Sequence, residues 1–288
     1  MGYADPDTMR KLCCVSKQFY DIIANNPGME QNRVVPLLEI SPAKDQDDAG
    51  RITRLLRFLQ HRSRDKLQRY RELKMIDANK FAALTRIPGR WNLDTLRLYG
   101  VVSLDISSPP PNTVIGDTID LYYFLSSILP NLRVINLSNN GCGSLYTFSK
   151  NCPNLEKITW HNIDRKQSAI SIDGYDMGRA ANLKQIYMDD SVFWLDHADE
   201  RHQLSDLEND EHSNIFLFNQ CRTKLERVSI RNAKWYGYGC PEDTVIPQKA
   251  LIKFVRNALT SLRWFRSDLT VKNMTMLRSE RPGIELVN

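Results

Sequence analysis

The sequence predicts an α/β repeat protein in which a parallel sheet lines one side and helices cover the other. A short apolar motif recurs along most of the 288 residues. Segments with apolar residues at helical spacing separate its copies, as in proteins built from stacked repeats. One continuous repeat body with a short N-terminal appendage accounts for the chain, and the predicted parts are residues 1–26 and 27–288.

The clearest copy of the motif runs from Leu132 to Asn140, with apolar residues at its positions 1, 4 and 6 and Asn at position 9. The alternation of Ile135 and Leu137 sends both side chains to one face of a short strand. Six further segments share this spacing, and they begin at Tyr70, Leu93, Leu155, Leu183, Leu225 and Leu262. A segment this short cannot bury its apolar face alone, so we expect the copies to stack as neighbouring strands.

This pattern resembles a leucine-rich-repeat array over roughly residues 34–288. The resemblance implies an α/β solenoid with a parallel sheet on its concave side and helices on its convex side. Apolar residues at helical spacing predict helices at 50–63, 116–128, 145–151, 213–222 and 247–259. In the second of these, Tyr122 and Tyr123 are expected to face inward. Residues 34–40 are predicted to form a short strand that begins the sheet, with Pro36 tolerated at an edge.

Residues 5–25 predict a short helix, because Asp5 and Pro6 favour a helix start and apolar residues then recur on one face. The segment resembles the second half of an F-box. The matching residues are Asp5, Pro6, Met9, Leu12, Val15, Ser16, Lys17, Phe19 and Ile22. The resemblance is to an N-terminally incomplete F-box, because the family's opening Leu-Pro-x-Glu segment and first helix are not among the four residues before Asp5.

The F-box resemblance implies docking on a Skp-type adaptor of a cullin-RING ubiquitin ligase. The residues implied for adaptor binding are Leu12, Val15, Phe19 and Tyr20. Under this interpretation the chain is the substrate-recognition subunit of an SCF-type ligase, and its repeats bind the target protein. The alternative is a leucine-rich-repeat scaffold without a ligase link, in which residues 1–26 cap the array.

The predicted partner-binding residues project outward from the concave sheet, between and just after the buried motif positions. They are Lys74, Arg97, Tyr99, Asn136, Ser138, Thr159, His161, Tyr187, Asp189, Ser229, Arg231, Trp264 and Arg266. This set mixes aromatic rings, hydrogen-bonding groups and both charge signs, as protein interfaces do. The sequence therefore predicts a protein-interaction module with a protein target.

Two charged segments stand out within a mild formal net charge of +5. Nine Lys or Arg fall between Arg51 and Lys74, and nine carboxylates with three histidines fall between Asp189 and His212. We interpret both segments as solvated surface. Too few aromatic residues accompany the basic segment to favour nucleic acid, and an acidic protein partner is the alternative there. The acidic segment lacks the ligand spacing of a metal site.

No catalytic motif, cofactor motif or paired-cysteine metal motif occurs, so we predict no enzyme activity, no cofactor and no metal. The six cysteines are scattered, and we expect them to be free thiols, mostly buried. They are Cys13, Cys14, Cys142, Cys152, Cys221 and Cys240. Neither a secretory signal nor a membrane-spanning segment is present in the sequence, so the expected location is the cytoplasm or nucleus.

Overall fold

The computed structural model describes residues 37–40, 68–75, 97–107, 119–140, 145–163, 170–172, 174–195, 217–237 and 243–288. The chain divides into two units, Met1–Val35 and Pro36–Asn288, and all described residues belong to the second unit. The boundary between residues 26 and 27 stays a prediction. The helices predicted at 5–25 and 50–63, most of the basic segment, and residues 196–212 of the acidic segment lie outside the described residues.

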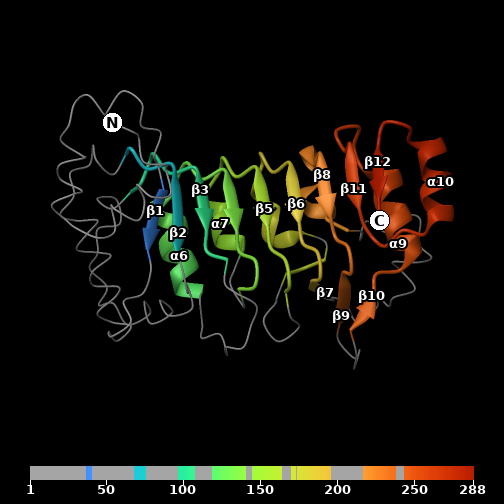
Figure 1. Cartoon of the computed structure of the whole chain (residues 1–288), viewed down its shortest axis with the longest axis horizontal. Helices are drawn as coiled ribbons and strands as arrows, with labels where there is room; N and C mark the ends of the chain where they lie inside the picture. Colours follow the sequence, from blue (N-terminus) through green and yellow to red (C-terminus); the bar gives the residue numbers. More distant parts are fainter. Residues whose placement is uncertain are drawn as a thin grey trace, which may run out of the picture. The chain divides into compact units, whose positions relative to one another are not determined.

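A nine-stranded sheet forms the body of the second unit (Figure 1). Its strands, in spatial order, are β1 (Leu37–Ile40), β2 (Glu72–Met75), β3 (Ser103–Asp105), β4 (Val134–Asn136), β5 (Lys157–Thr159), β6 (Gln185–Tyr187), β8 (Arg227–Ser229), β11 (Trp264–Arg266) and β12 (Glu285–Val287). All neighbouring strands are parallel and in matching register, so that Ile135 lies opposite Ile158 and Ile158 opposite Ile186. Each strand belongs to one repeat and pairs with the strands of the repeats beside it.

The middle residue of each motif strand points into the core, because alternate side chains of a strand face opposite ways. This core row includes Ile135, Ile158, Ile186, Val228 and Phe265, all of them 0% exposed. Motif positions 1 and 6 add two more buried rows. Six of the seven predicted copies of the motif are thereby confirmed, and so is the strand predicted within residues 34–40, which is the terminal strand β1.

The copy predicted to begin at Leu93 is wrong. The strand between β2 and β4 is Ser103–Asp105, and its buried motif positions are filled by Val101, Leu104 and Ile106. Both segments have the same apolar spacing, so spacing alone did not separate them. In the structure, a turn at Gly100 precedes the copy that begins at Val101. Gly100 lies close to the preceding repeat, since an added Cβ would be 2.1 Å from the Gln68 carbonyl oxygen.

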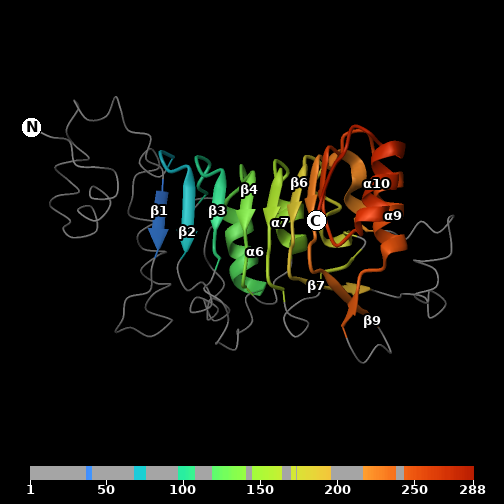
Figure 2. The ribbon, with the colours of Figure 1, turned by 45° about the vertical axis from the view of Figure 1, so that its right-hand side comes forward.

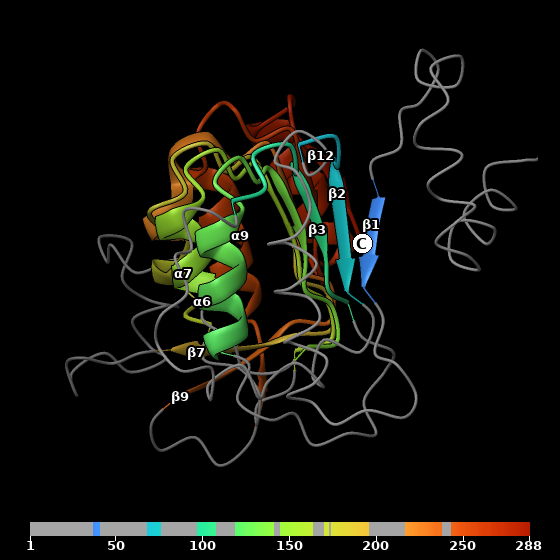
Figure 3. The same ribbon diagram turned by 90° about the vertical axis from the view of Figure 1, so that its left-hand side faces the viewer.

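Helices and 3₁₀ turns cover one face of the sheet, and no described helix covers the other face, called the open face below (Figures 2 and 3). They are α6 (Ile119–Ile128), α7 (Leu145–Asn151), η3 (Tyr175–Met177), η4 (Asn219–Lys224), α9 (Gln248–Asn257) and α10 (Val271–Glu280). Helices α6, α7 and α9 confirm three predicted helices. In the range predicted as a helix at 213–222, the described part forms a turn and the 3₁₀ segment η4.

Two details of the helical side differ from the prediction. Tyr123 is 57% exposed and faces outward, whereas the preceding residue, Tyr122, is fully buried. Helix α10 and strand β12 were not predicted, because the segment after Ser267 carries no further full copy of the motif. None of the helices in the described ranges combines the length and the apolar character needed to cross a membrane.

A second, three-stranded sheet continues from the carboxyl ends of the main strands, below β6 and β8 in Figure 1. It contains β7 (Val192–Leu195), β9 (Lys234–Gly237) and β10 (Thr244–Val245). Strands β7 and β9 are parallel, whereas β9 and β10 are antiparallel. Strand β7 occupies the first part of the segment predicted as a solvated acidic loop, which is therefore wrong for Val192–Leu195.

The two described cysteines, Cys152 and Cys221, are buried, as predicted, and Cys152 is a free thiol. The thiol of Cys152 lies 3.5 Å from the carbonyl oxygen of Leu129, to which it donates a weak hydrogen bond. Burial raises the pKa of this thiol to about 12, because a thiolate is poorly solvated in an apolar core. The other four cysteines lie outside the described residues.

Candidate functional site

The open face of the sheet is formed by the first and third residues of each three-residue strand, and no described helix covers it (Figure 3). On β5, β6, β8 and β11 these residues are Lys157, Thr159, Gln185, Tyr187, Arg227, Ser229, Trp264 and Arg266. The eight positions hold three cations and two aromatic rings, and none of them is a carboxylate. This part of the open face is therefore cationic and aromatic.

Two aromatic rings lie near each other on this cationic and aromatic part of the open face. The ring centroids of Tyr187 and Trp264 are 6.0 Å apart, although β8 lies between their strands. Arg227 on β8 has its Cζ atom 4.6 Å from the Trp264 ring centroid, and its Nε donates to the Tyr187 hydroxyl at 3.2 Å. Lys157 Nζ lies 5.0 Å from the Tyr187 ring centroid. Cation–π attraction thus holds both cations against rings. We call these four residues the aromatic–cation cluster.

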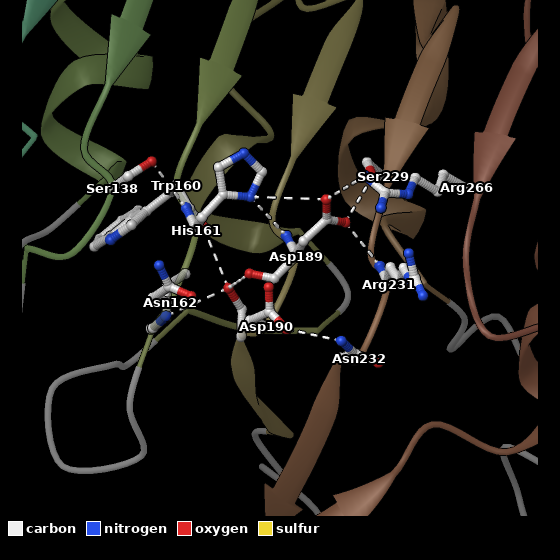
Figure 4. Close-up of polar contacts among 12 residues, drawn as sticks. Ser138, Trp160, His161, Asn162, Asp189, Asp190, Ser229, Arg231, Asn232 and Arg266 are labelled. Carbon is white, nitrogen blue, oxygen red and sulfur yellow. Dashed lines mark hydrogen bonds and ion pairs between the residues drawn. The ribbon is translucent and has the colours of Figure 1, made fainter. Parts of the chain in front are cut away.

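A buried carboxylate organises the polar groups at the carboxyl ends of the same strands (Figure 4). Asp189 is 8% exposed. Its Oδ1 accepts hydrogen bonds from the Ser229 hydroxyl at 2.6 Å and from the Arg231 backbone N–H at 2.8 Å. Its Oδ2 accepts a hydrogen bond from the Arg266 guanidinium at 3.2 Å. A charge this buried is stable only when donors surround it, and here three donors do so.

His161 extends this polar network toward β4. Its Nδ1 accepts the backbone N–H of Asp189 at 3.1 Å and lies 3.9 Å from Asp189 Oδ2. The backbone N–H of His161 donates to the Ser138 hydroxyl at 3.1 Å, and that hydroxyl donates to Asn136 Oδ1 at 2.8 Å. Polar contacts therefore run from β4 to β11.

The segments that follow β4, β5, β6 and β8 each contain one residue with a left-handed backbone. The φ angles are 61° at Asn139, 59° at Asn162, 55° at Asp190 and 53° at Asn232. Asn and Asp adopt this conformation more readily than most residues. Their side chains also pair across repeats, since Asn162 donates to Asn139 at 2.7 Å and Asn232 donates to Asp190 at 2.9 Å.

Asn140, the asparagine that marks position 9 of the motif, has a different role from its neighbour Asn139. It is buried, and its side-chain amide donates to the carbonyl oxygen of Ile106 in the preceding repeat. Its own carbonyl oxygen accepts the indole N–H of Trp160 at 3.1 Å. Asn140 therefore satisfies buried backbone and indole groups between repeats and does not contribute to an exposed site.

A shallow polar hollow of about 500 Å³, open to solvent, lies at this edge of the sheet. Its lining residues are His161, Asn162, Asp189, Asp190, Arg231, Asn232 and Arg266. In the described part of the chain, no three or more His, Cys, Asp or Glu side chains are grouped so as to hold a metal ion.

Ser229, Asp189 and His161 have the residue types of a catalytic triad but not its geometry. In a triad the serine hydroxyl bonds to histidine, and the carboxylate supports the other side of the imidazole. Here the Ser229 hydroxyl donates to Asp189 and is 1% exposed, while His161 Nδ1 accepts a backbone N–H. This arrangement activates no nucleophile.

Most predicted partner-binding residues lie at the outward strand positions or in the turns that follow. Those at least partly exposed are Lys74, Asn136, Thr159, His161, Tyr187, Arg231, Trp264 and Arg266. Ser138, Asp189 and Ser229 were predicted to be exposed there, which is wrong: they are 8%, 8% and 1% exposed, because neighbouring side chains cover them. The implied adaptor-binding residues Leu12, Val15, Phe19 and Tyr20 lie outside the described residues.

The predicted positions of Arg97 and Tyr99 are also wrong. Both residues precede β3 and lie at the turn before it, because the motif copy begins at Val101. The open-face residues of this repeat are Ser103 and Asp105. Sequence reasoning also missed Lys157 and Arg227. The signal was present, since strand alternation places the residue before each core position on the same face as the residue after it.

The stacked motif and the parallel sheet with helices on its opposite face define the second unit as a leucine-rich-repeat solenoid. No protein-family profile matches the chain, and no curated protein matches it. Ten chains of solved structures match. One is an internalin from Listeria monocytogenes, with 11% sequence identity and a TM-score of 0.39; the match covers 77% of this chain. The matched part is 54% of the internalin, about half of its length.

Proposed function

We propose that the second unit is a protein-binding module whose open face takes up the partner. The observation that supports this proposal is the aromatic–cation cluster, in which Tyr187 and Trp264 are only partly buried. Trp, Tyr and Arg are the side chains that most often dominate binding energy at protein interfaces. Because strands and cation–π contacts already fix these groups, little conformational entropy is lost when a partner binds.

The proposed activity is binding and not catalysis. The carboxylate best placed to act on a substrate, Asp189, is buried and fully engaged by Ser229, Arg231 and Arg266. Its contacts connect neighbouring strands. They thereby help to fix the strands that carry the aromatic–cation cluster. The polar network is therefore proposed to support the binding surface.

Partner capture with matched variants tests this proposal. The tagged chain is used to capture proteins from a cell lysate, together with Trp264→Ala on the open face and Tyr175→Ala on the helical side. Tyr175 is a suitable control because it is an aromatic residue with 62% of its surface exposed. We expect a captured protein that is lost with Trp264→Ala and retained with Tyr175→Ala. Proteins retained equally by both variants would contradict the proposal.

A narrower proposal rests on the sequence of residues 5–22. We propose that this segment docks on a Skp-type adaptor, and that the open face then presents its partner to a cullin-RING ubiquitin ligase in the cytoplasm or nucleus. What supports it is the F-box resemblance of the segment. The alternative is a leucine-rich-repeat scaffold without a ligase link.

Binding of a purified Skp-type adaptor distinguishes these two functions. Leu12→Asp and Phe19→Asp change the apolar face of the predicted helix, whereas Asp21→Ala changes its opposite face. Adaptor binding that is lost in the first two variants and kept in the third supports the ligase function. A chain that is folded by circular dichroism and binds no adaptor supports the scaffold.

A further inference from the structure

The cations of the aromatic–cation cluster have no carboxylate partner within the described residues. Lys157 and Arg227 contact aromatic rings, and neither forms an ion pair there. Arg266 differs, because the buried Asp189 neutralises it. Two positive charges, at outward positions on either side of Gln185 on β6, are thus available to a partner.

The charged residues just before the strands do not cancel this surplus. Arg133 forms a bidentate contact with Glu156 at 2.9 and 2.8 Å. Lys184 pairs with Glu226 at 3.8 Å. These carboxylates are therefore already occupied by their own cations. Arg263, which ends the row, adds another cation that has no carboxylate partner among the described residues.

Among the described residues, the carboxylates at outward strand positions lie outside the strands from β5 to β11. Glu285 on β12 stands opposite Trp264 in the sheet register, and Asp105 lies on β3, beyond β4. The cationic region thus extends over the four strands from β5 to β11. Strands spaced by about 4.8 Å make this width roughly 15 Å, which an extended segment of about five residues crosses.

We infer that the partner of the open face binds through a short, extended acidic segment, whose carboxylates contact Lys157 and Arg227 while apolar or aromatic side chains pack against Tyr187 and Trp264. This inference rests on the proposed function and specifies the chemistry of the partner. Charge complementarity supports it, since the eight outward positions on β5, β6, β8 and β11 hold Lys157 and Arg227 without a carboxylate partner among the described residues, and none of the eight is an acid. Nucleic acid fits less well, because one face of each ring already has a cation against it and base stacking needs free rings.

The inference is tested with a fluorescent poly-glutamate peptide and the full chain, using anisotropy at low and moderate salt. The informative variants are Arg227→Glu and Lys157→Glu. The matched control is Lys272→Glu on α10, an exposed residue whose substitution changes net charge equally. We expect each open-face variant to weaken binding by about tenfold or more, and the control to stay within about twofold, since contact charges matter more than net charge.

Three results would overturn the inference. One is the absence of poly-glutamate binding to the unmodified chain. Another is an equal loss of affinity in all three variants, which would show that binding follows net charge. The third is displacement of the peptide by an equal concentration of oligodeoxythymidylate, which would favour a nucleic acid as the occupant.

The captured partner separates failure of this inference from failure of the proposed function. A partner that depends on Trp264 but is not displaced by excess poly-glutamate, and is retained by Arg227→Glu, leaves the protein-binding function intact and overturns the acidic segment. If no captured partner depends on Trp264, the proposed function itself fails.

Discussion

The Ser229 hydroxyl donates a 2.6 Å hydrogen bond to the Asp189 carboxylate and thereby joins β8 to the turn that follows β6. Arg231 and Arg266 add two more donors to the same carboxylate. A buried carboxylate would be unfavourable alone, and each donor would be unsatisfied without it. The stability of this region therefore depends on Asp189 more than on other acidic residues nearby.

Asp189→Ala is expected to lower the free energy of unfolding by about 2–4 kcal/mol, because it leaves a buried hydroxyl, a backbone N–H and a guanidinium without their acceptor. Urea denaturation followed by circular dichroism measures this change. The control is Asp190→Asn, because Asp190 is exposed and Asn keeps both its left-handed backbone and an oxygen that accepts the hydrogen bond from Asn232. That substitution should cost less than about 1 kcal/mol. Equal effects of the two substitutions would contradict the role assigned to Asp189.

Gly100→Ala is expected to destabilise the fold by about 2–3 kcal/mol, because the added methyl group would meet backbone atoms that cannot move aside. The nearest are the carbonyl oxygens of Gln68 at 2.1 Å and Tyr70 at 2.6 Å. Gly283→Ala is the matched control, since an added Cβ there has no heavy atom within 4 Å. It should change stability by less than about 1 kcal/mol. Thermal unfolding of both variants gives the comparison, and similar Tm values would refute the expected difference.

The Cys152 thiol is expected to resist alkylation in the folded protein, because burial raises its pKa to about 12 and the thiolate is the reactive form. Iodoacetamide labelling near neutral pH, read by peptide mass spectrometry, should modify Cys152 only after the chain is unfolded in urea.

The same thiol makes stability dependent on pH. The folded state keeps the proton while the unfolded chain loses it above the ordinary pKa of 9.0, so stability falls as pH rises from there toward about 12. Cys152→Ala should make this decline shallower. Rapid labelling of Cys152 in the folded chain, or an unchanged decline in the variant, would contradict the assigned burial.

Asn162→Val is expected to destabilise the protein by about 1–2 kcal/mol more than Asn162→Gly, because a β-branched residue is strained at a φ of 59°. Thr159 on β5 is the control, and there the Val variant should be more stable than the Gly variant, because a strand backbone favours Val over Gly. Chemical denaturation of the four variants gives the two differences. The same order at both positions would show that backbone conformation does not decide the effect.

Much of the fold follows from the positions of apolar residues in the sequence. Ile135, Ile158 and Ile186 are predicted by strand alternation, and their burial does not depend on distant side chains. The frame of β3 was not predictable in this way, because Leu96 and Leu104 fit the same spacing. What separates them is the close contact of Gly100 with the preceding repeat, which is a tertiary feature.

The candidate site was predicted less completely than the core. Sequence alternation identified Trp264 and Tyr187 as outward residues, and the structure confirms their position. It could not show that Ser229 is buried, because that burial comes from Asp189 and other neighbours brought together by strand pairing. Contacts among outward side chains depend on which residues lie on adjacent strands, and the motif specifies only the inward ones.

In a repeat array each repeat is normally stabilised by contacts with its immediate neighbours alone, so the array can unfold from its ends one repeat at a time. The Asp189 carboxylate departs from that rule, because it bonds to Ser229 on the adjacent strand and also to Arg266 one strand further. The strands from β6 to β11 are thus linked beyond nearest neighbours. Their amide hydrogens should exchange with solvent in one concerted opening, at a single free energy. Because of this cooperativity, the open face of β6, β8 and β11 would be either wholly formed or wholly lost.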